Sequence, residues 1–398
     1  MAIEHFHNCQ DNKNSIVRMK KIVFLSTMAF EANVSIIKRL RQHYEVYYIA
    51  MFNYGKCSLG FLDLKSDVTA VRQIKEFAPF HDYIDIDKSY IVKHPEGLTL
   101  KKFTVDFKVL NLVKKIKPDV ILTDAANVCM LLPRFAFRKH VISLVHDPFP
   151  HSGEDTFVRV LANKLLVKFS SRYVLFNQVQ KQEFINRYKV NPAFVFCTYL
   201  STYEHLKVYD KLKVEKNDKL INILFYGRIS PYKGIEYLLK AIRSFYQNGN
   251  NGIEVTIAGK GSFDFDISEY ERLPYVHIKN TFIESSDLIK MIKESSAVIC
   301  PYTDATQSGV VMTAYAFGKP VIATNVGGLP EMLNNGELGI LIPPKNIKAI
   351  EDAFVKIKKN PSLLSDYSEK IKQVYENGNK SWNNAVSLLK NAIESLYL

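Results

Sequence analysis

A chain of 398 residues, with 47% hydrophobic and 23% charged residues, is long enough for two domains and has the composition of a folded globular protein, which excludes disordered and fibrous classes. The formal net charge of +13 lies mostly in the first half, because residues 1–200 contain 29 Lys and Arg against 18 Asp and Glu, a net +11. No apolar run has the length of a membrane span and the cysteines form no metal-ligand cluster, so we expect a cytoplasmic protein with reduced thiols at Cys9, Cys57, Cys129, Cys197 and Cys300.

After a flexible polar tail, residues 1–19, the first domain is predicted to begin with a buried strand, Lys21–Thr27, and a helix, Val34–Arg41. The pattern then continues through Glu45–Met51, Val109–Ile116, Val120–Thr123, His140–Val145, Tyr173–Phe176 and Phe194–Tyr199. Strands that alternate with helices are typical of βαβ units, in which helices cover both faces of a parallel sheet. We therefore predict an α/β domain over residues 20–200.

A polar, lysine-rich stretch predicts an interdomain linker over residues 201–218. A second alternating series predicts a second doubly wound domain over residues 219–375. Its segments are Ile221–Tyr226, Gly234–Phe245, Ile253–Ala258, Ser286–Glu294, Ala297–Cys300, Gly309–Phe317, Pro320–Thr324 and Ile347–Lys358. Residues 376–398 are predicted to hold an amphipathic helix. Its pattern does not say on which domain it packs, and a return to the N-terminal domain is one option.

The segment Tyr226–Gly234, YGRISPYKG, lies between a predicted strand and a predicted helix. Ligands of doubly wound sheets bind at the carboxyl ends of strands, which is where this loop falls. Gly227 permits a close backbone approach, and Arg228 and Lys233 provide two cations that suit a diphosphate. The loop alone is equally consistent with a solvated turn that carries surface cations.

A second candidate lies in Cys300–Thr324, which is predicted to run from strand to loop, helix, turn and strand. Ser308, Gly309 and Val310 fall at the start of the helix, where free N–H groups and the helix dipole favour a phosphate. Locally, a helix cap explains the same residues equally well.

Four segments between Gly227 and Glu331 occur in a characteristic order: GRISPYKG, VTIAGKG, AFGKPVIAT and GGLPE. Together they resemble the C-terminal domain of glycosyltransferase family 4, the retaining transferases of the GT-B type. The resemblance implies two Rossmann-like doubly wound domains that face a cleft. The N-terminal half resembles the family mainly in architecture.

The resemblance implies a role for each matching residue. Arg228 and Lys233 correspond to the pair that binds the donor diphosphate and neutralises the leaving nucleotide. Ser308, Gly309 and Val310 correspond to the backbone that holds the sugar and the distal phosphate. Gly259 and Gly261 correspond to a turn beside the nucleoside, and the base is expected against the segment Asn280–Ile283, which includes Phe282 and Ile283.

One departure from the family concerns its two glutamates, E-x7-E, whose positions are occupied here by Ala305 and Thr313. Asp304 lies one place from the first position and is a candidate substitute, while the Thr313 hydroxyl is a candidate ribose contact. The glycine-rich loop of the family is also missing, because residues 26–33 read STMAFEAN. The missing glutamates place the identity of the donor sugar in question more than the diphosphate site.

In the N-terminal domain, His146 and Asp147 follow a predicted strand and are expected to face the cleft. The resemblance matches His146 with a histidine that contacts the donor sugar near the reacting carbon. A structural His–Asp pair, with Asp147 fixing the imidazole, is the alternative.

Apolar residues between Thr156 and Tyr173 alternate with Arg159, Lys164, Lys168 and Arg172 at helical spacing. Such a helix can lie on an anionic membrane surface, or it can pack on the core with a basic outer face. The basic first half keeps open a peripheral contact with the inner face of the membrane.

The sequence therefore predicts a glycosyltransferase that moves a sugar, with retention and without a metal, from a nucleotide sugar, by default a UDP-sugar, to a saccharide or lipid-linked saccharide acceptor in polysaccharide or glycoconjugate synthesis. No cofactor and no nucleic acid partner are expected. A GT-B nucleotide-sugar epimerase and a weakly active nucleotide-sugar-binding protein remain the alternatives. The sequence leaves open the base, the sugar, the acceptor and the oligomeric state.

Overall fold

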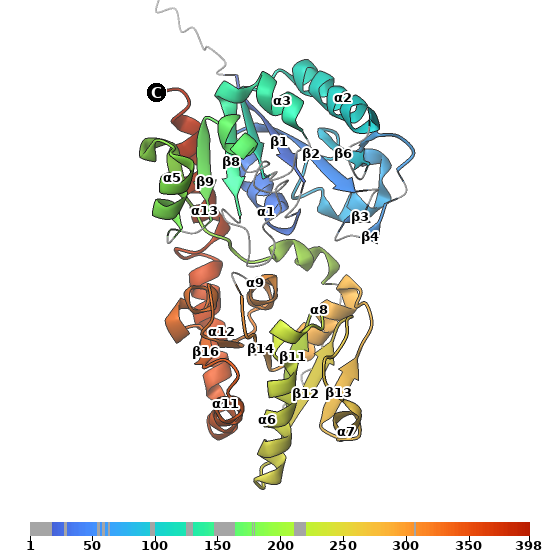
Figure 1. Cartoon of the computed structure of the whole chain (residues 1–398), viewed down its shortest axis with the longest axis vertical. Coiled ribbons are helices and arrows are strands. Elements are labelled where there is room, and N and C mark those ends of the chain that lie inside the picture. The colour runs from blue at the N-terminus through green and yellow to red at the C-terminus, as the bar shows by residue number, and fades with distance from the viewer. Residues whose placement is uncertain are drawn as a thin grey trace, which may run out of the picture.

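The chain forms two α/β units that lie end to end, with the last helix returning to the first unit (Figure 1). The computed structural model describes residues 18–27, 30–53, 56–57, 60–62, 64–95, 100–124, 130–146, 164–176, 178, 180–210, 220–305 and 308–398.

Within these residues, the first unit has an eight-stranded sheet in the order β10-β9-β8-β7-β1-β2-β6-β5, parallel except for the edge strand β5. Its strands are β1 (Lys21–Ser26), β2 (Glu45–Asn53), β5 (Val68–Ala70), β6 (Ser89–His94), β7 (Val120–Thr123), β8 (Val141–Val145), β9 (Arg172–Leu175) and β10 (Val195–Cys197), beside a hairpin of β3 (Lys56–Cys57) and β4 (Gly60–Phe61).

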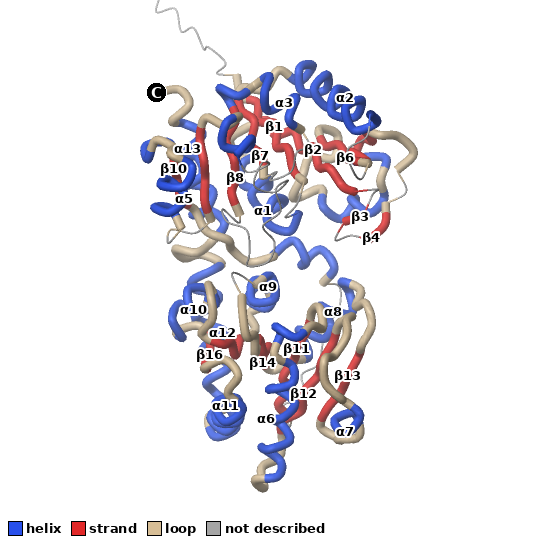
Figure 2. Tube along the Cα trace, viewed as in Figure 1, coloured by secondary structure: helices blue, strands red, loops and turns tan. Residues whose placement is uncertain are grey.

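Helices cover both faces of this sheet (Figure 2). They are α1 (Phe30–Leu40), α2 (Leu100–Ile116), α3 (Leu131–Ala136) and α5 (Lys181–Tyr188), with 3₁₀ turns η1 (Val71–Gln73), η2 (Lys75–Phe80), η3 (Arg138–His140) and η4 (Pro192–Phe194). Successive residues of β1 enter different cores: Ile22 packs in the core beneath α1, and Val23 packs in the core beneath α2. A strand buried on both sides needs an uninterrupted apolar run, which KIVFL provides.

The second unit has a six-stranded parallel sheet, within the described residues, in the order β13-β12-β11-β14-β15-β16. The strands are β11 (Ile221–Tyr226), β12 (Ile253–Ala258), β13 (Val276–Lys279), β14 (Ala297–Cys300), β15 (Val321–Thr324) and β16 (Gly339–Ile342). The helices are α6 (Ile235–Gln247), α7 (Ser268–Glu271), α8 (Ser285–Glu294), α9 (Gly309–Ala316), α10 (Leu329–Met332), α11 (Ile347–Lys359) and α12 (Ser362–Tyr375), with turns η6 (Pro231–Lys233) and η7 (Asn334–Gly336). The predicted architecture of two doubly wound units is confirmed.

The segment that was predicted as a polar linker, residues 201–218, differs from that expectation in its described part. Residues 204–209 form the 3₁₀ helix η5 (Glu204–Tyr209), and Ser201 and His205 are buried at 0% and 2% exposure. Residues 211–219 lie outside the described part. The composition is that of a linker, but the first ten residues pack as a structural element because both domains contact them.

Polar contacts tie η5 to both domains. Its Glu204 carboxylate forms a two-point ion pair with Arg39 of α1, and the Glu204 carbonyl accepts a hydrogen bond from Tyr83 at 3.0 Å. On the other side, Asp210 pairs with Lys293 of α8 at 2.6 Å. Helices α1 and α9 both contact this element, and Phe30 at the start of α1 packs on His205 with 6.0 Å between ring centroids. Since these helices follow the carboxyl ends of β1 and β14, the corresponding edges of the two sheets meet around η5.

The final helix, α13 (Trp382–Glu394), packs against α1, β9 and β10 of the first unit. The Trp382 indole is buried and donates to the Thr202 carbonyl at 2.7 Å. Arg172 binds the end of this helix, donating to the Ser395 hydroxyl at 2.8 Å and to its carbonyl at 2.6 Å. Arg172 is therefore a helix-terminus contact, which removes it from the proposed membrane-binding stripe. Arg159 of that stripe lies outside the described residues.

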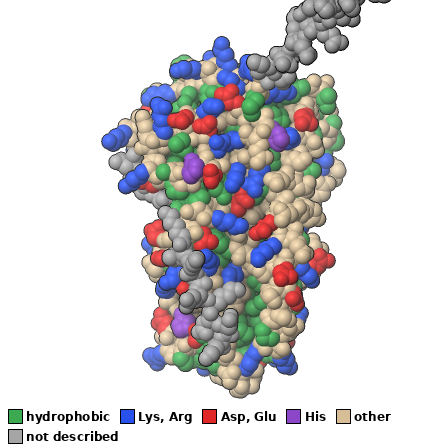
Figure 3. Space-filling view, turned by 180° about the vertical axis from the view of Figure 1, so that it is seen from behind, with side chains coloured by type: hydrophobic (Ala, Val, Ile, Leu, Met, Phe, Trp, Pro, Cys, Tyr) green, Lys and Arg blue, Asp and Glu red, His purple; other side chains and the backbone are tan. Residues whose placement is uncertain are grey.

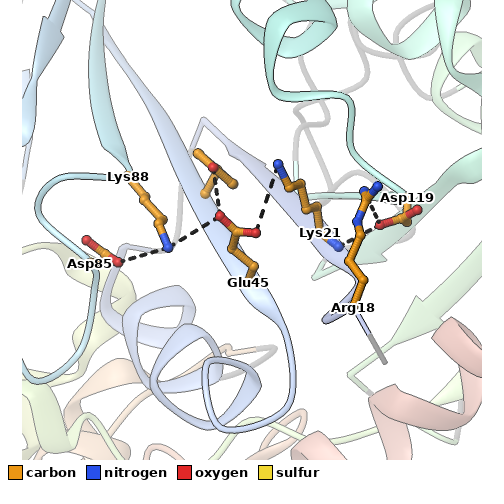
Figure 4. Close-up of polar contacts among 7 residues, drawn as sticks. Arg18, Lys21, Glu45, Asp85, Lys88 and Asp119 are labelled. Atoms are coloured by element: carbon orange, nitrogen blue, oxygen red, sulfur yellow. Dashed lines mark hydrogen bonds and ion pairs between the residues drawn. The ribbon is translucent and has the colours of Figure 1, made fainter. Parts of the chain in front are cut away.

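Ion pairs among partly exposed side chains connect the amino ends of the strands in the first unit (Figure 4). Glu45 at the start of β2 pairs with Lys88 at 3.3 Å and lies 4.0 Å from Lys21, while Arg18 pairs with Asp119 at 3.5 Å. Surface pairs of this kind contribute about 0–1 kcal/mol each. They lie at the edge of the sheet opposite to the strand ends that approach η5.

None of the described helices is both long and apolar enough to cross a membrane.

Candidate functional site

The end of β11 and the start of α9 are in direct contact. Gly227 follows the strand with φ of +119°, and a Cβ atom built on it would lie 3.6 Å from the Val310 side chain. The Tyr226 hydroxyl donates to the Val310 carbonyl at 2.8 Å. Two segments that are more than eighty residues apart in the sequence thus form one corner, as expected for neighbouring strands β11 and β14.

Lys233 lies in this corner. Its ammonium nitrogen lies 3.6 Å from the centroid of the Tyr302 ring, and the Tyr302 hydroxyl is 3.4 Å from the Ser308 hydroxyl. Lys233 and Ser308 therefore contact the same tyrosine, Lys233 at the face of the ring and Ser308 at the hydroxyl. Burial lowers the pKa of Lys233 to about 8, and the positive charge of Arg228 acts in the same direction, whereas Cys300 opposes it. Arg228 itself is exposed.

Gly234 fixes the position of η6 and of Lys233 within it. The residue has φ of +66°, and a Cβ there would lie 1.9 Å from the Pro301 carbonyl oxygen. Only glycine allows this contact without displacing the backbone. The close approach holds the loop after β11 against the loop after β14. Tyr302 lies in the loop after β14.

The turn after β12 is held equally closely. A Cβ on Gly259, whose φ is +152°, would lie 1.8 Å from the Gly227 carbonyl oxygen. The Asn280 amide brackets Gly261, accepting from its N–H and donating to its carbonyl at 3.1 Å each. In the next segment, Ile283 packs on the core while Phe282 is 63% exposed. The segments that were expected around a nucleoside therefore border the same corner.

Tyr203 reaches this corner from the interdomain segment. Its backbone N–H donates to the Met312 carbonyl at 3.2 Å, and its ring lies 2.9 Å from where a Cβ on Gly309 would stand. Any side chain at Gly309 would collide with this ring. The sequence did not indicate a role for Tyr203, because the polar composition around it predicts a linker.

The residues considered for the missing glutamates have different surroundings. The Thr313 hydroxyl is buried and donates to the Gly309 carbonyl at 2.8 Å, one turn back in its own helix. This differs from the expectation of a hydroxyl directed at a ribose, because the hydroxyl proton is used within α9. Asp304 is exposed, and Ala305 packs against the core.

On the N-terminal side, His146 follows β8 and its ring stacks on Phe176 with 4.3 Å between ring centroids. The Nε2 atom is buried and has no hydrogen-bond partner among the described residues. Burial lowers the pKa of His146 to about 4, so the imidazole is neutral at physiological pH. Phe176 also lines an interdomain pocket with Gly328 and Glu331 of the GGLPE segment. Asp147 lies outside the described residues.

A buried polar cluster, which the sequence did not predict, lies at the ends of β1 and β7. The Asp124 carboxylate accepts from the Ser26 hydroxyl and the Thr27 N–H, each at 2.9 Å, and from the Asn33 amide. This cluster joins the last residue of β1, the loop after it and Asn33 of α1 to the residue that follows β7. The run TDAAN directly after a buried strand was the available signal. Among the described residues, no group of three or more His, Cys, Asp or Glu is placed to hold a metal ion.

Part of the chain is similar in sequence to known glycosyltransferases. Residues 210–374 match the model of glycosyl transferases group 1. The uncharacterized glycosyltransferase MJ1607 of Methanocaldococcus jannaschii is 30% identical over 225 residues, which is 52% of this chain and 53% of that protein. This chain thus matches about half the length of that relative, and the matched family segment is the one that contains Gly227, Lys233 and Gly309.

Solved structures share the fold over nearly the whole chain. The crystal structure of Anabaena Alr3699/HepE in complex with UDP has a TM-score of 0.65 at 15% identity, covering 95% of this chain and 99% of that one. A putative UDP-N-acetylglucosamine 2-epimerase from Listeria monocytogenes has a TM-score of 0.62 at 12% identity, covering 96% and 97%. The fold is therefore GT-B. Because transferases and epimerases share it, the fold alone does not choose between them.

Proposed function

We propose that this protein transfers a glycosyl group from a nucleoside diphosphate sugar to an acceptor. The observation that carries the proposal is the corner at which Gly227, Lys233 and Ser308 converge on Val310 and Tyr302. A diphosphate there would meet two cations and the free N–H groups at the start of α9. The group 1 match over residues 210–374 supports a transferase in preference to an epimerase.

In the proposed reaction, the bond between the anomeric carbon and the diphosphate breaks, and a bond from the acceptor oxygen to the same carbon forms. Lys233 and Arg228 stabilise the negative charge that develops on the departing diphosphate. In keeping with the family resemblance, we propose retention of configuration without a metal, with the acceptor proton passing to an oxygen of the departing phosphate. His146, neutral and with an unsatisfied buried Nε2, would contact the donor sugar by a hydrogen bond.

We propose that the nucleoside lies between the Gly259–Gly261 turn and the segment that contains Phe282 and Ile283. Asn280 keeps the turn in place through the Gly261 backbone, which supports this location. A uridine nucleotide is the first choice for testing. The acceptor, a saccharide or lipid-linked saccharide, would enter from the N-terminal side.

Incubation with a panel of nucleotide sugars tests the proposal. We expect one donor to be transferred to an acceptor or slowly hydrolysed, with release of the nucleoside diphosphate, which is measured by liquid chromatography. Recovery of an altered sugar still attached to its nucleotide would instead identify an epimerase. Tight binding in a thermal-shift assay without any turnover would identify a binding protein.

The affinity for UDP should fall as pH rises through the pKa of Lys233. This pKa is lowered to about 8, so the free site loses its ammonium charge above that pH. Because a bound diphosphate favours the charged lysine, we expect the Kd for UDP to rise about tenfold between about pH 7 and pH 9. Isothermal titration calorimetry measures the change. In Lys233→Arg, whose guanidinium stays charged, the profile should be flatter, and equal slopes in both proteins would contradict the assignment.

A further inference from the structure

The helix α2 carries large apolar side chains on its solvent-facing side. Leu100, Phe103 and Phe107 are 86%, 64% and 55% exposed and follow one another at three- and four-residue steps. The opposite side of the helix is already occupied, because Val105 and Val109 pack in the core against the sheet. The exposed apolar stripe is thus additional to what the fold of the domain requires.

Basic side chains surround this stripe. Lys101, Lys108, Lys114 and Lys115 are exposed, and the one carboxylate of α2, Asp106, is buried at 5% exposure. Lys108 pairs with Asp67 at 2.6 Å, and apart from the buried Asp106 all charged side chains of α2 are lysines.

Helix α3 lies beside α2 (Figure 1). It adds a further exposed aromatic side chain with a cation next to it. Its Phe135 is 54% exposed, and the Arg138 guanidinium lies 5.3 Å from the centre of the Phe135 ring. Viewed from behind, Lys and Arg side chains are spread widely over the N-terminal domain (Figure 3). The outward surface of α2, together with Phe135 of α3 and Arg138 of the following turn η3, is called the α2–α3 face below.

We propose that the α2–α3 face docks on an anionic lipid bilayer, with Leu100, Phe103 and Phe107 entering the interfacial region and the lysines meeting the headgroups. Exposed aromatic and leucine side chains beside lysines are the composition of helices that lie in membrane interfaces. Lysine is depleted in protein–protein interfaces, so the charge pattern favours lipid over a protein partner. This docking differs from the sequence prediction, which placed membrane contact in residues 156–173.

The topology gives the docking a direction. Leu100 lies six residues after His94, the end of β6, and β6 runs parallel to β1 and β2. The apolar start of α2 is therefore near the carboxyl edge of the sheet, the edge that also carries His146 and the Asp124 cluster. An acceptor held at a lipid surface would reach the protein on the side of the proposed active site.

Vesicle co-sedimentation of the full chain tests the docking independently of the transfer reaction. We expect binding to phosphatidylcholine vesicles that contain about 30% phosphatidylglycerol, little binding to phosphatidylcholine alone, and a marked loss between about 50 and 500 mM salt. The double variant Phe103→Ser, Phe107→Ser should lower the partition coefficient at least about tenfold. The double variant Lys114→Glu, Lys115→Glu should lower it by about tenfold.

A matched control carries the same change of charge on the other domain. Lys359→Glu with Lys370→Glu, on α11 and α12, should change vesicle binding by no more than about twofold. All variants should keep the circular dichroism spectrum and the UDP affinity of the unaltered protein, so a failed docking proposal is distinguishable from a failed donor site. Equal binding by the α2 variants and the unaltered protein would overturn the proposal. So would absence of vesicle binding, or a solution dimer that the Phe103 and Phe107 substitutions abolish.

Discussion

Replacing Lys233 by alanine should lower kcat/KM about a hundredfold, and Arg228→Ala should do so to a similar extent, because each removes a cation from the position proposed for the departing diphosphate. Lys233 has the more constrained position, because its ammonium group lies over the Tyr302 ring, whose hydroxyl is 3.4 Å from the Ser308 hydroxyl at the start of α9. Lys233→Arg retains the charge and should recover part of the activity. Initial rates at varied donor concentration separate kcat from KM.

The exposed Lys290 of α8 provides a control for the loss of one positive charge. Lys290→Ala should leave kcat/KM within about twofold of the unaltered protein. If both Arg228→Ala and Lys233→Ala retained full activity, the diphosphate could not lie at this corner and the proposed function would lose its support. The double variant should fall by less than the product of the single effects, because the two cations act on the same charge.

Asp124→Ala should lower the free energy of unfolding of the N-terminal domain by about 3–5 kcal/mol, because it removes a buried carboxylate from a cluster of donors and a buried cation. Arg134 is 1% exposed, and burial lowers its pKa to about 10 even though the charge of Asp124 acts in the opposite direction. Without Asp124, the Arg134 guanidinium loses the nearby negative charge that favours its ionised form. The backbone N–H of Thr27 loses its hydrogen-bond acceptor. Urea unfolding followed by circular dichroism measures the loss.

Asp124→Asn should cost less than Asp124→Ala, because the amide oxygen still accepts one of the two hydrogen bonds that Ser26 and Thr27 donate to different carboxylate oxygens of Asp124. The exposed Asp82, whose side chain is 72% accessible, serves as control, and Asp82→Ala should change stability by no more than about 0.5 kcal/mol. A loss below about 1 kcal/mol for Asp124→Ala would show that the cluster does not hold the loop after β1.

Local patterns predicted the strands of the second unit closely. The apolar runs Ile221–Tyr226, Ile253–Ala258 and Ala297–Cys300 became β11, β12 and β14 with the same bounds. Shorter or more polar strands were not predicted. An example is β13, with the sequence VHIK, which is a strand because it pairs with β12 and not because of its own composition. Helix α12 was missed for a related reason, since its buried residues Tyr367, Ile371 and Tyr375 occupy only one narrow stripe.

The candidate donor site was predictable to the extent that it is built from loops with fixed local roles. Gly234 and Gly259 are required where two backbone segments touch, and such positions can be recognised in the sequence as glycines in short loops after strands. The contact of Tyr203 with Gly309 could not be recognised in this way, because it joins a segment between the domains to a helix more than one hundred residues later.

By itself, the sequence determined the alternation of strands and helices, the two-unit GT-B fold and the order of the loops that follow β11, β12 and β14, because these depend on apolar periodicity and on glycines whose requirements are local. Only the tertiary structure decided that η5 is buried between the domains, that α13 returns to the first unit, that Asp124 gathers the loop after β1, and that α2 exposes Phe103 and Phe107. Each of these depends on which distant surface covers a side chain, and an apolar residue in a helix has the same local pattern whether its partner is a sheet or solvent.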